Sequence, residues 1–122
     1  MSKKENVAVL GASDNPERYS YKAYHLLEEH GHSVELVSPR YDIIEGKKVH
    51  KDLSTLQNID TLTMYVNPDI SNKMKDQIIK LKPKRVIFNP GTENPELENT
   101  LNEMGIEVEE ACTLVLLRTN QY

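Results

Sequence analysis

Short apolar runs alternate along this chain with amphipathic segments, and this alternation constrains the fold more than any other feature. The first run, Asn6–Leu10, is rich in Val and Leu and ends at Gly11, which is typical of a strand buried on both faces. From Ser20 onwards the apolar period changes to i, i+3, i+4, i+7, which predicts a helix carrying Ala23, Leu26, Leu27 and His30 on one face. The alternation of strand and helix patterns predicts an α/β domain with a mostly parallel sheet.

The remaining elements follow from the same patterns. Further strands are expected at Ser33–Val37, Lys48–His50, Thr61–Val66, Arg85–Phe88 and Ile106–Glu109. Helices are expected at Asp52–Gln57, at Ser71–Lys82, between the start signal Asn94-Pro95-Glu96 and Gly105, and after Cys112. Ser20 is the expected N-cap of the first helix, and Leu53 and Leu56 are expected to face the core.

Composition limits the classes of function. The chain has 122 residues, which predicts a single domain over residues 1–122 and excludes a two-domain enzyme within this length. The balance of 15 basic against 19 acidic residues, a net charge of −4, argues against a nucleic-acid partner. Polar Met1–Asn6 and the shortness of the aliphatic run Leu114–Leu117 predict a cytoplasmic protein with no membrane partner. A lone Cys112 excludes an internal disulfide.

The loops that follow the predicted strands are the expected place for a ligand. In an open parallel sheet, ligands bind outside the carboxyl ends of the strands, at the point where the strand order reverses. This rule selects four segments that are rich in Gly, Pro, Asn and Ser: Gly11–Ser20, Ser38–Arg40, Asn67–Asp69 and Asn89–Glu93. Any one of them alone would be read as an ordinary turn.

The loop after the first strand favours an anionic ligand but departs from the dinucleotide fingerprint. It leads from a strand through Gly11 into a helix, where the N-terminus of the helix attracts anions. The pattern G-x-G-x-x-G is absent, because Ser13 stands in place of the second glycine. The second strand is followed by Ser38-Pro39-Arg40, with no acidic residue before Asp42, which disfavours NAD and favours a ligand with a phosphate on the ribose.

No catalytic or metal-binding set emerges from the sequence. The four histidines lack the spacing of a metal site, and Cys112 has no His or Asp arrangement near it. A phospho-receiver regulator would need acidic residues at the end of the first strand, where Gly11-Ala12-Ser13 stands instead. The sequence therefore predicts neither catalytic residues nor metal ligands within this chain.

Several motifs together resemble the small single-domain CoA-binding proteins, which are similar to the N-terminal domain of the succinyl-CoA synthetase α subunit. The diagnostic part is Gly11-Ala12-Ser13 with the downstream Pro16-x-Arg18-x-Ser20. Weaker matches span the rest of the chain: Gly31, Val37-Ser38-Pro39, Ile44-x-Gly46-x-x-Val49, Leu53, Pro68, Gly91, Gly105-Ile106 and Cys112-x-Leu114. The chain departs from the family pattern at Ser38, where Asn is common, and at Asn89-Pro90, where an aromatic-Gln pair is common.

The resemblance implies a Rossmann-like three-layer domain with strand order 3-2-1-4-5-6 and coenzyme A or an acyl-CoA as the bound cofactor. It implies that Gly11, Ala12 and Ser13 hold phosphate through backbone amides and the Ser hydroxyl, with Arg18 and Ser20 closing over the ligand. Tyr19 is expected to cover the ligand because it lies next to this loop. By the same resemblance, Pro39 and Arg40 flank the adenosine and its 3′-phosphate. Asn67 and Pro68 then border the path of the pantetheine, and Gly91 is also expected among the binding residues.

Two functions are expected from these residues. The first is a CoA or acyl-CoA binding module, acting as a carrier, sensor or regulator without a catalytic set of its own. The alternative is a subunit of an NADP- or CoA-dependent enzyme whose active site is completed by a partner. Both functions require a small nucleotide ligand, and both leave room for a protein partner or a homodimer.

Overall fold

A computed structural model describes residues 4–122, and the first three residues of the polar segment Met1–Asn6 lie outside the described part. The strands are β1 (Asn6–Leu10), β2 (Ser33–Val37), β3 (Ile43–Ile44), β4 (Lys47–His50), β5 (Thr61–Met64), β6 (Arg85–Phe88) and β7 (Glu107–Glu110). The helices are α1 (Tyr19–Glu29), α2 (Pro68–Lys73), α3 (Lys75–Leu81), α4 (Pro95–Glu103) and α5 (Thr113–Arg118). Within residues 4–122, no helix is both long enough and apolar enough to cross a membrane.

The strands form one sheet in the order β3-β4-β2-β1-β5-β6-β7. Every neighbouring pair is parallel except β3 and β4, which form an antiparallel hairpin at the edge. Without β3, this order is the 3-2-1-4-5-6 arrangement that the resemblance implies. The α/β class and the strand order are therefore confirmed, with β3 as a short additional strand that the sequence pattern did not indicate.

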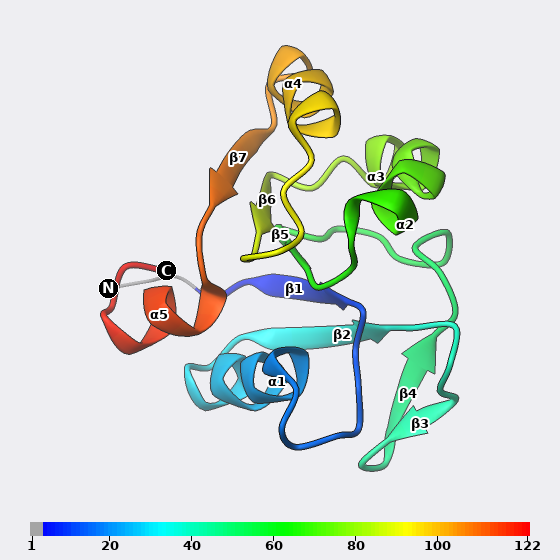
Figure 1. Ribbon diagram of the computed structural model, residues 1–122. Coiled ribbons are helices and arrows are strands. Elements are labelled where there is room, and N and C mark those ends of the chain that lie inside the picture. The colour runs from blue at the N-terminus through cyan, green and yellow to red at the C-terminus, as the bar shows by residue number, and fades with distance from the viewer. Residues whose placement is uncertain (1–3) are drawn as a thin grey trace.

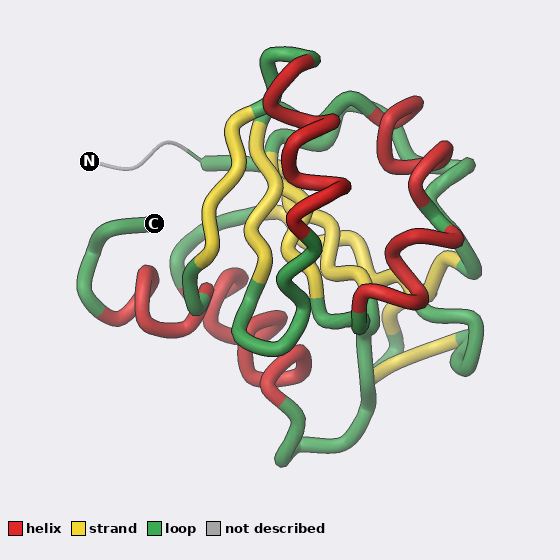
Figure 2. Tube along the Cα trace, turned by 45° about the horizontal axis from the view of Figure 1, so that its top comes forward, coloured by secondary structure: helices red, strands yellow, loops and turns green. Residues whose placement is uncertain are grey.

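Helices cover both faces of the sheet (Figures 1 and 2), and alternate residues of the strands feed two separate cores. On the face of α1 and α5, Val7 and Val9 of β1 pack with Leu27 of α1 and with other buried side chains. On the face of α2, α3 and α4, Ala8 and Leu10 of β1 belong to the second core. Because β1 is buried on both faces, its continuous apolar run is explained by its central place in the sheet.

Two sequence predictions about helices are wrong in detail. Asp52–Gln57 forms bends and a turn rather than a helix. The Asp52 carboxylate accepts hydrogen bonds from the backbone N–H and the hydroxyl of Ser54, and this local turn competes with helix formation. Leu53 and Leu56 are nevertheless buried, as the pattern predicted. The single helix expected at Ser71–Lys82 is two helices, because the chain turns at Met74 between α2 and α3.

The start of α1 also differs from the prediction. The N-cap is Arg18, while Ser20 is the second residue of the helix and is buried. The remaining strands lie where the pattern placed them, although β5 ends at Met64 and β7 begins at Glu107. Such shifts of one or two residues are usual at element ends.

Candidate functional site

The parallel arrangement brings the loops after β1, β2, β5 and β6 to the carboxyl edge of the sheet. β1 lies at the point where the strand order reverses, with β2 on one side and β5 on the other. The segments that sequence analysis selected therefore share one edge, and the central place belongs to the Gly11 loop. Each of the eleven predicted site residues lies in one of these loops or in the first turn of the helix that follows it.

Gly11 makes the sharp turn at the end of β1, and alanine cannot replace it without strain. Its φ is +95°, a conformation that favours glycine, and a Cβ built on it would lie 2.8 Å from the carbonyl oxygen of Tyr65. That oxygen is backbone and cannot rotate away. Gly11 is thus needed for the close approach of the β1 loop to the chain that leaves β5.

The backbone amides of Gly11 and Ala12 are occupied within the chain. Both donate hydrogen bonds to the carbonyl oxygen of Val37, at 2.9 Å and 3.0 Å, and so tie the loop to the end of β2. The expectation that these two amides hold a phosphate therefore needs revision, because their donors already have an acceptor. In this arrangement Gly11 and Ala12 shape the loop, and the accessible donors lie further along the chain.

The segment from Ser13 to Arg18 is closed by local hydrogen bonds. The Ser13 hydroxyl accepts from the backbone N–H of Asn15, and the Asn15 side chain accepts from the N–H of Glu17, each at 3.0 Å. The N–H of Arg18 donates to the carbonyl of Asn15 at 3.0 Å, which completes a turn around Pro16. Among residues 4–122, neither the Ser13 hydroxyl proton nor the Ser13 N–H has an acceptor.

The N-terminus of α1 is left open. The cap residue, Arg18, makes no side-chain hydrogen bond to the helix, and the first turn contains no acidic residue. In α4, by contrast, Asn94 caps the helix and Glu96 and Glu98 lie in the first turn. The uncapped N–H groups and the helix dipole give the start of α1 a positive potential. An anion outside the protein can therefore take the place that a cap residue has in α4.

Arg18 and Tyr19 lie at this open helix end, and a second arginine, Arg40, lies in the loop after β2 at the same edge of the sheet. Arg18 and Arg40 are exposed, and neither forms an ion pair with any residue in the described range 4–122. The Tyr19 ring is 67% exposed, and the Lys22 ammonium lies 5.6 Å from its centroid. Ser20 faces inward and is buried, so its hydroxyl is not placed to cover a ligand in this conformation.

The loop after β2 holds Arg40 at the carboxyl edge. Ser38 is buried, its N–H donates to the carbonyl of His50, and its hydroxyl accepts from the Arg40 N–H at 3.1 Å. These bonds fix the backbone of Arg40 and leave its guanidinium exposed. Ser38 therefore does the anchoring at the position where the family commonly has Asn.

The predicted residues after β5 and β6 have structural bonds of their own. The Asn67 side chain caps α2 by accepting from the Ile70 N–H at 3.0 Å, and half-buried Pro68 is the first residue of that helix. The Gly91 N–H donates to the Glu93 carboxylate at 2.9 Å. A ligand phosphate would compete with the Glu93 carboxylate for the Gly91 N–H. This side of the carboxyl edge therefore suits an uncharged part of a ligand better.

Asn89 joins three elements, which the sequence did not predict. Its side-chain amide donates to the Thr63 hydroxyl and to the Met64 carbonyl, both at 2.8 Å, and its oxygen accepts from the Thr113 N–H at 2.9 Å. The two threonine hydroxyls are also 2.8 Å apart. Asn89 thus links β6, β5 and the start of α5, at the place where the family pattern has an aromatic residue. The departure was visible in the sequence, but its partners were not.

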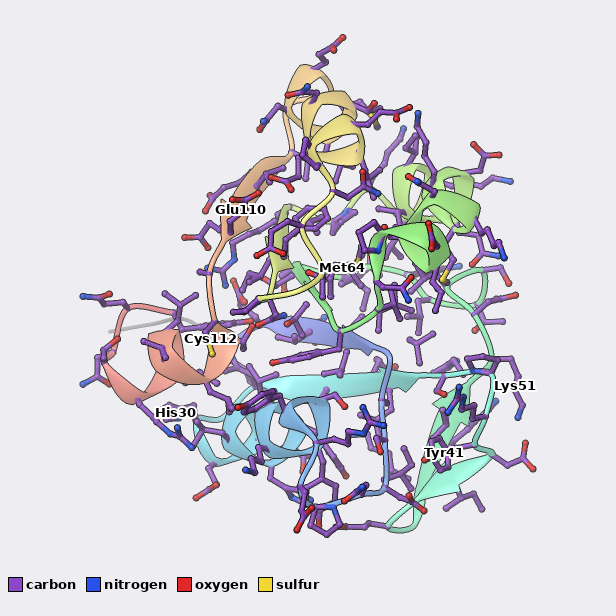
Figure 3. All side chains as sticks on the ribbon, in the orientation of Figure 1. His30, Tyr41, Lys51, Met64, Glu110 and Cys112 are labelled. Atoms are coloured by element: carbon purple, nitrogen blue, oxygen red, sulfur yellow. The ribbon has the colours of Figure 1, made fainter. Side chains whose placement is uncertain are left out.

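Tyr65 and Cys112 lie near this network, although they are far apart in the sequence. Burial raises the pKa of the Tyr65 hydroxyl to about 12, with a smaller contribution from the nearby Cys112. Cys112 is half-buried at the start of α5, whereas Tyr41 and Lys51 lie beside β4 on another side of the molecule (Figure 3).

Two open cavities lie at the opposite edge of the sheet. One, of about 410 Å³, is lined by residues that include Asn6, Ser33 and Ile59, and the other, of about 330 Å³, by residues that include Asn58, Asp60 and Lys84. These residues begin strands or precede them, so the cavities are at the amino edge. In this fold the crossover helices end at that edge, and helix C-termini repel anions. The candidate site for an anionic ligand is therefore the carboxyl edge.

The fold and this edge define a class of protein. A parallel sheet with its reversal point at β1, a glycine turn and an open helix N-terminus form the nucleotide-binding type of α/β domain. The particular family follows from the sequence itself, because the family model of the CoA binding domain matches residues 5–118. The chain belongs to this CoA-binding family.

Solved structures agree with this assignment. The crystal structure of an uncharacterized protein has 40% identity and a TM-score of 0.95, with 99% of this chain and 100% of that chain covered. The structure of cell-free ID.343 from Thermus thermophilus has 28% identity and a TM-score of 0.87, with coverage of 98% and 91%. No curated protein sequence matches this chain significantly.

A more distant likeness concerns the fold alone. A dinucleotide-forming acetyl-coenzyme A synthetase 1 from Ca. Korarchaeum cryptofilum, in complex with phosphate and ADP, has 22% identity and a TM-score of 0.71. The likeness covers 88% of this chain but 25% of that chain. The same fold thus occurs both in chains of this length and as part of a much larger protein.

Proposed function

We propose that this chain is a single-domain binding module for coenzyme A or an acyl-CoA, acting as a carrier, sensor or regulator. The open N-terminus of α1 is the observation that carries the proposal, since it offers unpaired N–H groups and a positive potential to a phosphate. Family membership over residues 5–118 supports CoA as the ligand that supplies this phosphate. The net charge of −4 means that local groups must hold the anion against the overall field.

The ligand would lie along the carboxyl edge in a single orientation, which the charges of the loops determine. Its phosphates would meet the Ser13 hydroxyl and N–H, the first turn of α1 and the Arg18 guanidinium, with Tyr19 beside them. Its adenosine and 3′-phosphate would lie next to Pro39 and Arg40. The uncharged pantetheine would run past Asn67 and Pro68 toward Gly91, where the Glu93 carboxylate disfavours a phosphate.

Arg40 also supports a second candidate, a subunit of an NADP- or CoA-dependent enzyme completed by a partner. A guanidinium at the end of β2 is placed as in domains that bind a ribose phosphate. The two candidates differ in the ligand that stabilises the isolated chain. They do not differ in the location of the site.

A thermal-shift panel with CoA, acetyl-CoA, NADP and NAD tests the proposal. A ligand that binds only the folded state stabilises it by about 2.7 kcal/mol at a concentration of 100 times its Kd. We expect CoA and acetyl-CoA to raise the Tm, and NAD to leave it unchanged. A shift with NADP and none with CoA would contradict the proposal and favour the second candidate.

Arg40→Ala tests the placement of the 3′-phosphate. Loss of one charge-assisted contact is expected to weaken CoA about tenfold and to leave dephospho-CoA unchanged, because only CoA carries the 3′-phosphate. Arg118→Ala is the matched control, since Arg118 is an exposed arginine at the end of α5. Equal losses for both ligands, measured by calorimetry, would refute the role of Arg40.

A further inference from the structure

The two ends of the carboxyl edge carry different charged groups. Arg18 and Arg40, in the loops after β1 and β2, form no ion pair within residues 4–122. Residues 86–117 contain seven glutamates and no Lys, Arg or His. They include the loop after β6, α4, β7 and the start of α5, on the opposite side of β1 from β2 (Figure 1). One end of this edge therefore offers unpaired arginines, and the other end offers carboxylates.

Three of these glutamates gather at the carboxyl edge. Glu93 accepts the Gly91 N–H at 2.9 Å, so its carboxylate lies at the loop after β6. Glu98, in the first turn of α4, accepts the Asn94 N–H at 2.9 Å. Burial raises the pKa of Glu98, and the neighbouring carboxylates of Glu110, at the end of β7, and of Glu93 raise it further. We call Glu93, Glu98 and Glu110 the carboxylate cluster.

No cation neutralises the carboxylate cluster within the described part of the chain. None of its three members forms an ion pair among residues 4–122. Glu109, by contrast, pairs with Arg85 at 3.1 Å on the other face of the sheet, because successive side chains of β7 point to opposite faces. An anionic group brought to this end of the edge would therefore meet like charges only.

The pantetheine arm of a CoA bound at the proposed site is long enough to reach the carboxylate cluster. β1, β5, β6 and β7 are consecutive in the sheet, and neighbouring strands lie about 4.8 Å apart. The end of β7 is therefore about 14 Å from the end of β1, where the Gly11 loop begins. The pantetheine chain has about as many bonds as four extended residues, which span about 14 Å. The thiol or acyl group would then lie beside the cluster.

We propose that this site accepts an uncharged acyl group, so that the chain binds free CoA and thioesters of monocarboxylic acids and discriminates against thioesters of dicarboxylic acids. This inference rests on the proposed function and adds the class of acyl group to it. The carboxylate cluster is not a separate binding site but limits what the proposed site accepts. The second carboxylate of a malonyl or succinyl group would meet the cluster, and this repulsion should weaken binding about tenfold at low salt.

Calorimetric titration of the full chain with matched thioesters tests the class of acyl group. Succinyl and butyryl groups have the same number of carbons, and only succinyl carries a terminal carboxylate. At about 20 mM salt we expect succinyl-CoA to bind about tenfold more weakly than butyryl-CoA. At about 500 mM, where the Debye length is only a few ångströms, this ratio should fall below about threefold. Equal affinities at low salt, or a ratio that salt does not change, would overturn the inference.

Neutral variants test the part of the carboxylate cluster. In Glu93→Gln, Glu110→Gln, two exposed carboxylates become amides of the same shape, and the new side chain at position 93 can still accept the Gly91 N–H. Succinyl-CoA should bind this variant about fivefold more tightly than the wild type, with butyryl-CoA unchanged. The control Glu103→Gln, Glu107→Gln removes the same charge at exposed residues of the amino edge and should keep the wild-type ratio. An unchanged ratio in the cluster variant, or the same change in the control, contradicts the inference.

The same titrations separate this inference from the proposed function. If the chain binds neither CoA nor butyryl-CoA, the proposed function is wrong and the acyl preference is wrong with it. If both bind and succinyl-CoA binds equally well, the proposed function stands and only the class of acyl group is overturned. Circular dichroism checks that the variants fold. If the cluster variant is unfolded, Glu110→Gln alone should tighten succinyl-CoA binding about twofold, and an unchanged affinity would overturn the inference.

Discussion

Replacement of Gly11 by alanine tests whether the close approach of the β1 loop to Tyr65 shapes the site. The new Cβ would lie 2.8 Å from the Tyr65 carbonyl oxygen and 3.1 Å from a methyl carbon of Val66. A Cβ at the positive φ of +95° costs about 1–2 kcal/mol by itself. Relief of the clash requires backbone movement, and overpacking of this kind costs about 1–3 kcal/mol more.

Gly105→Ala separates these two costs. Gly105 has a similar φ of +82°, but a Cβ there has no atom within 4 Å. Both variants share the φ cost and the entropy change of the unfolded chain, so the difference between them reports the clash at Gly11. We expect Gly11→Ala to be less stable than Gly105→Ala by about 1–3 kcal/mol.

Urea unfolding at 25 °C, followed by circular dichroism, measures both free energies. For a chain of 122 residues, 1 kcal/mol corresponds to about 4 °C in Tm, so scanning calorimetry should show the same order. Equal stabilities of the two variants would refute the reasoning that the Tyr65 backbone excludes a side chain at Gly11. If Gly11→Ala also binds CoA more weakly than Gly105→Ala does, the loop geometry matters for the proposed ligand.

Two further changes should affect stability. Asn89→Ala removes three buried hydrogen bonds and should lower the free energy of unfolding in urea by about 2–4 kcal/mol. The control Asn102→Ala, at an exposed position of α4, should lower it by less than about 1 kcal/mol. Similar losses for the two variants would contradict the linking role of Asn89. Burial lowers the pKa of His32, whose Nδ1 accepts a hydrogen bond from the Glu5 N–H. As the pH falls, the imidazole of His32 is therefore protonated in the unfolded chain before it is protonated in the folded chain. Stability should therefore be complete above about pH 6.5 and should fall below it by at most about 1.4 kcal/mol per pH unit, the limit for one proton. In His32→Asn, which keeps an acceptor but does not titrate, that part of the pH dependence should disappear, and an unchanged pH profile would exclude His32 as its source.

Local patterns were sufficient for the elements whose surroundings are simple. The continuous apolar run of Asn6–Leu10 predicted a central strand, and Asn94-Pro95-Glu96 predicted the start of α4, because both signals lie within a few neighbouring residues. The helix predicted at Asp52–Gln57 was wrong, because the spacing of Leu53 and Leu56 also suits a turn that points both side chains inward. The Asp52 side chain favours that turn, which a hydrophobic pattern cannot show.

The candidate site, like the fold, could be predicted from the sequence only in part. The order of strands and the glycine turn follow from the sequence and its family pattern, so the location at the carboxyl edge could be predicted. The occupation of the Gly11 and Ala12 amides by Val37 could not, because it depends on how closely the ends of β1 and β2 meet. The same holds for Asn89, whose partners at Thr63 and Thr113 come from elements that the sheet brings together.

The sequence by itself determined the alternation of strands and helices, the CoA-binding family and the edge at which a ligand is expected. These features depend on residue types at short spacings, which can be read from the sequence without knowledge of the tertiary structure. Only the tertiary structure decided which donors remain free for an anion, since a backbone N–H is available only if no distant carbonyl accepts it.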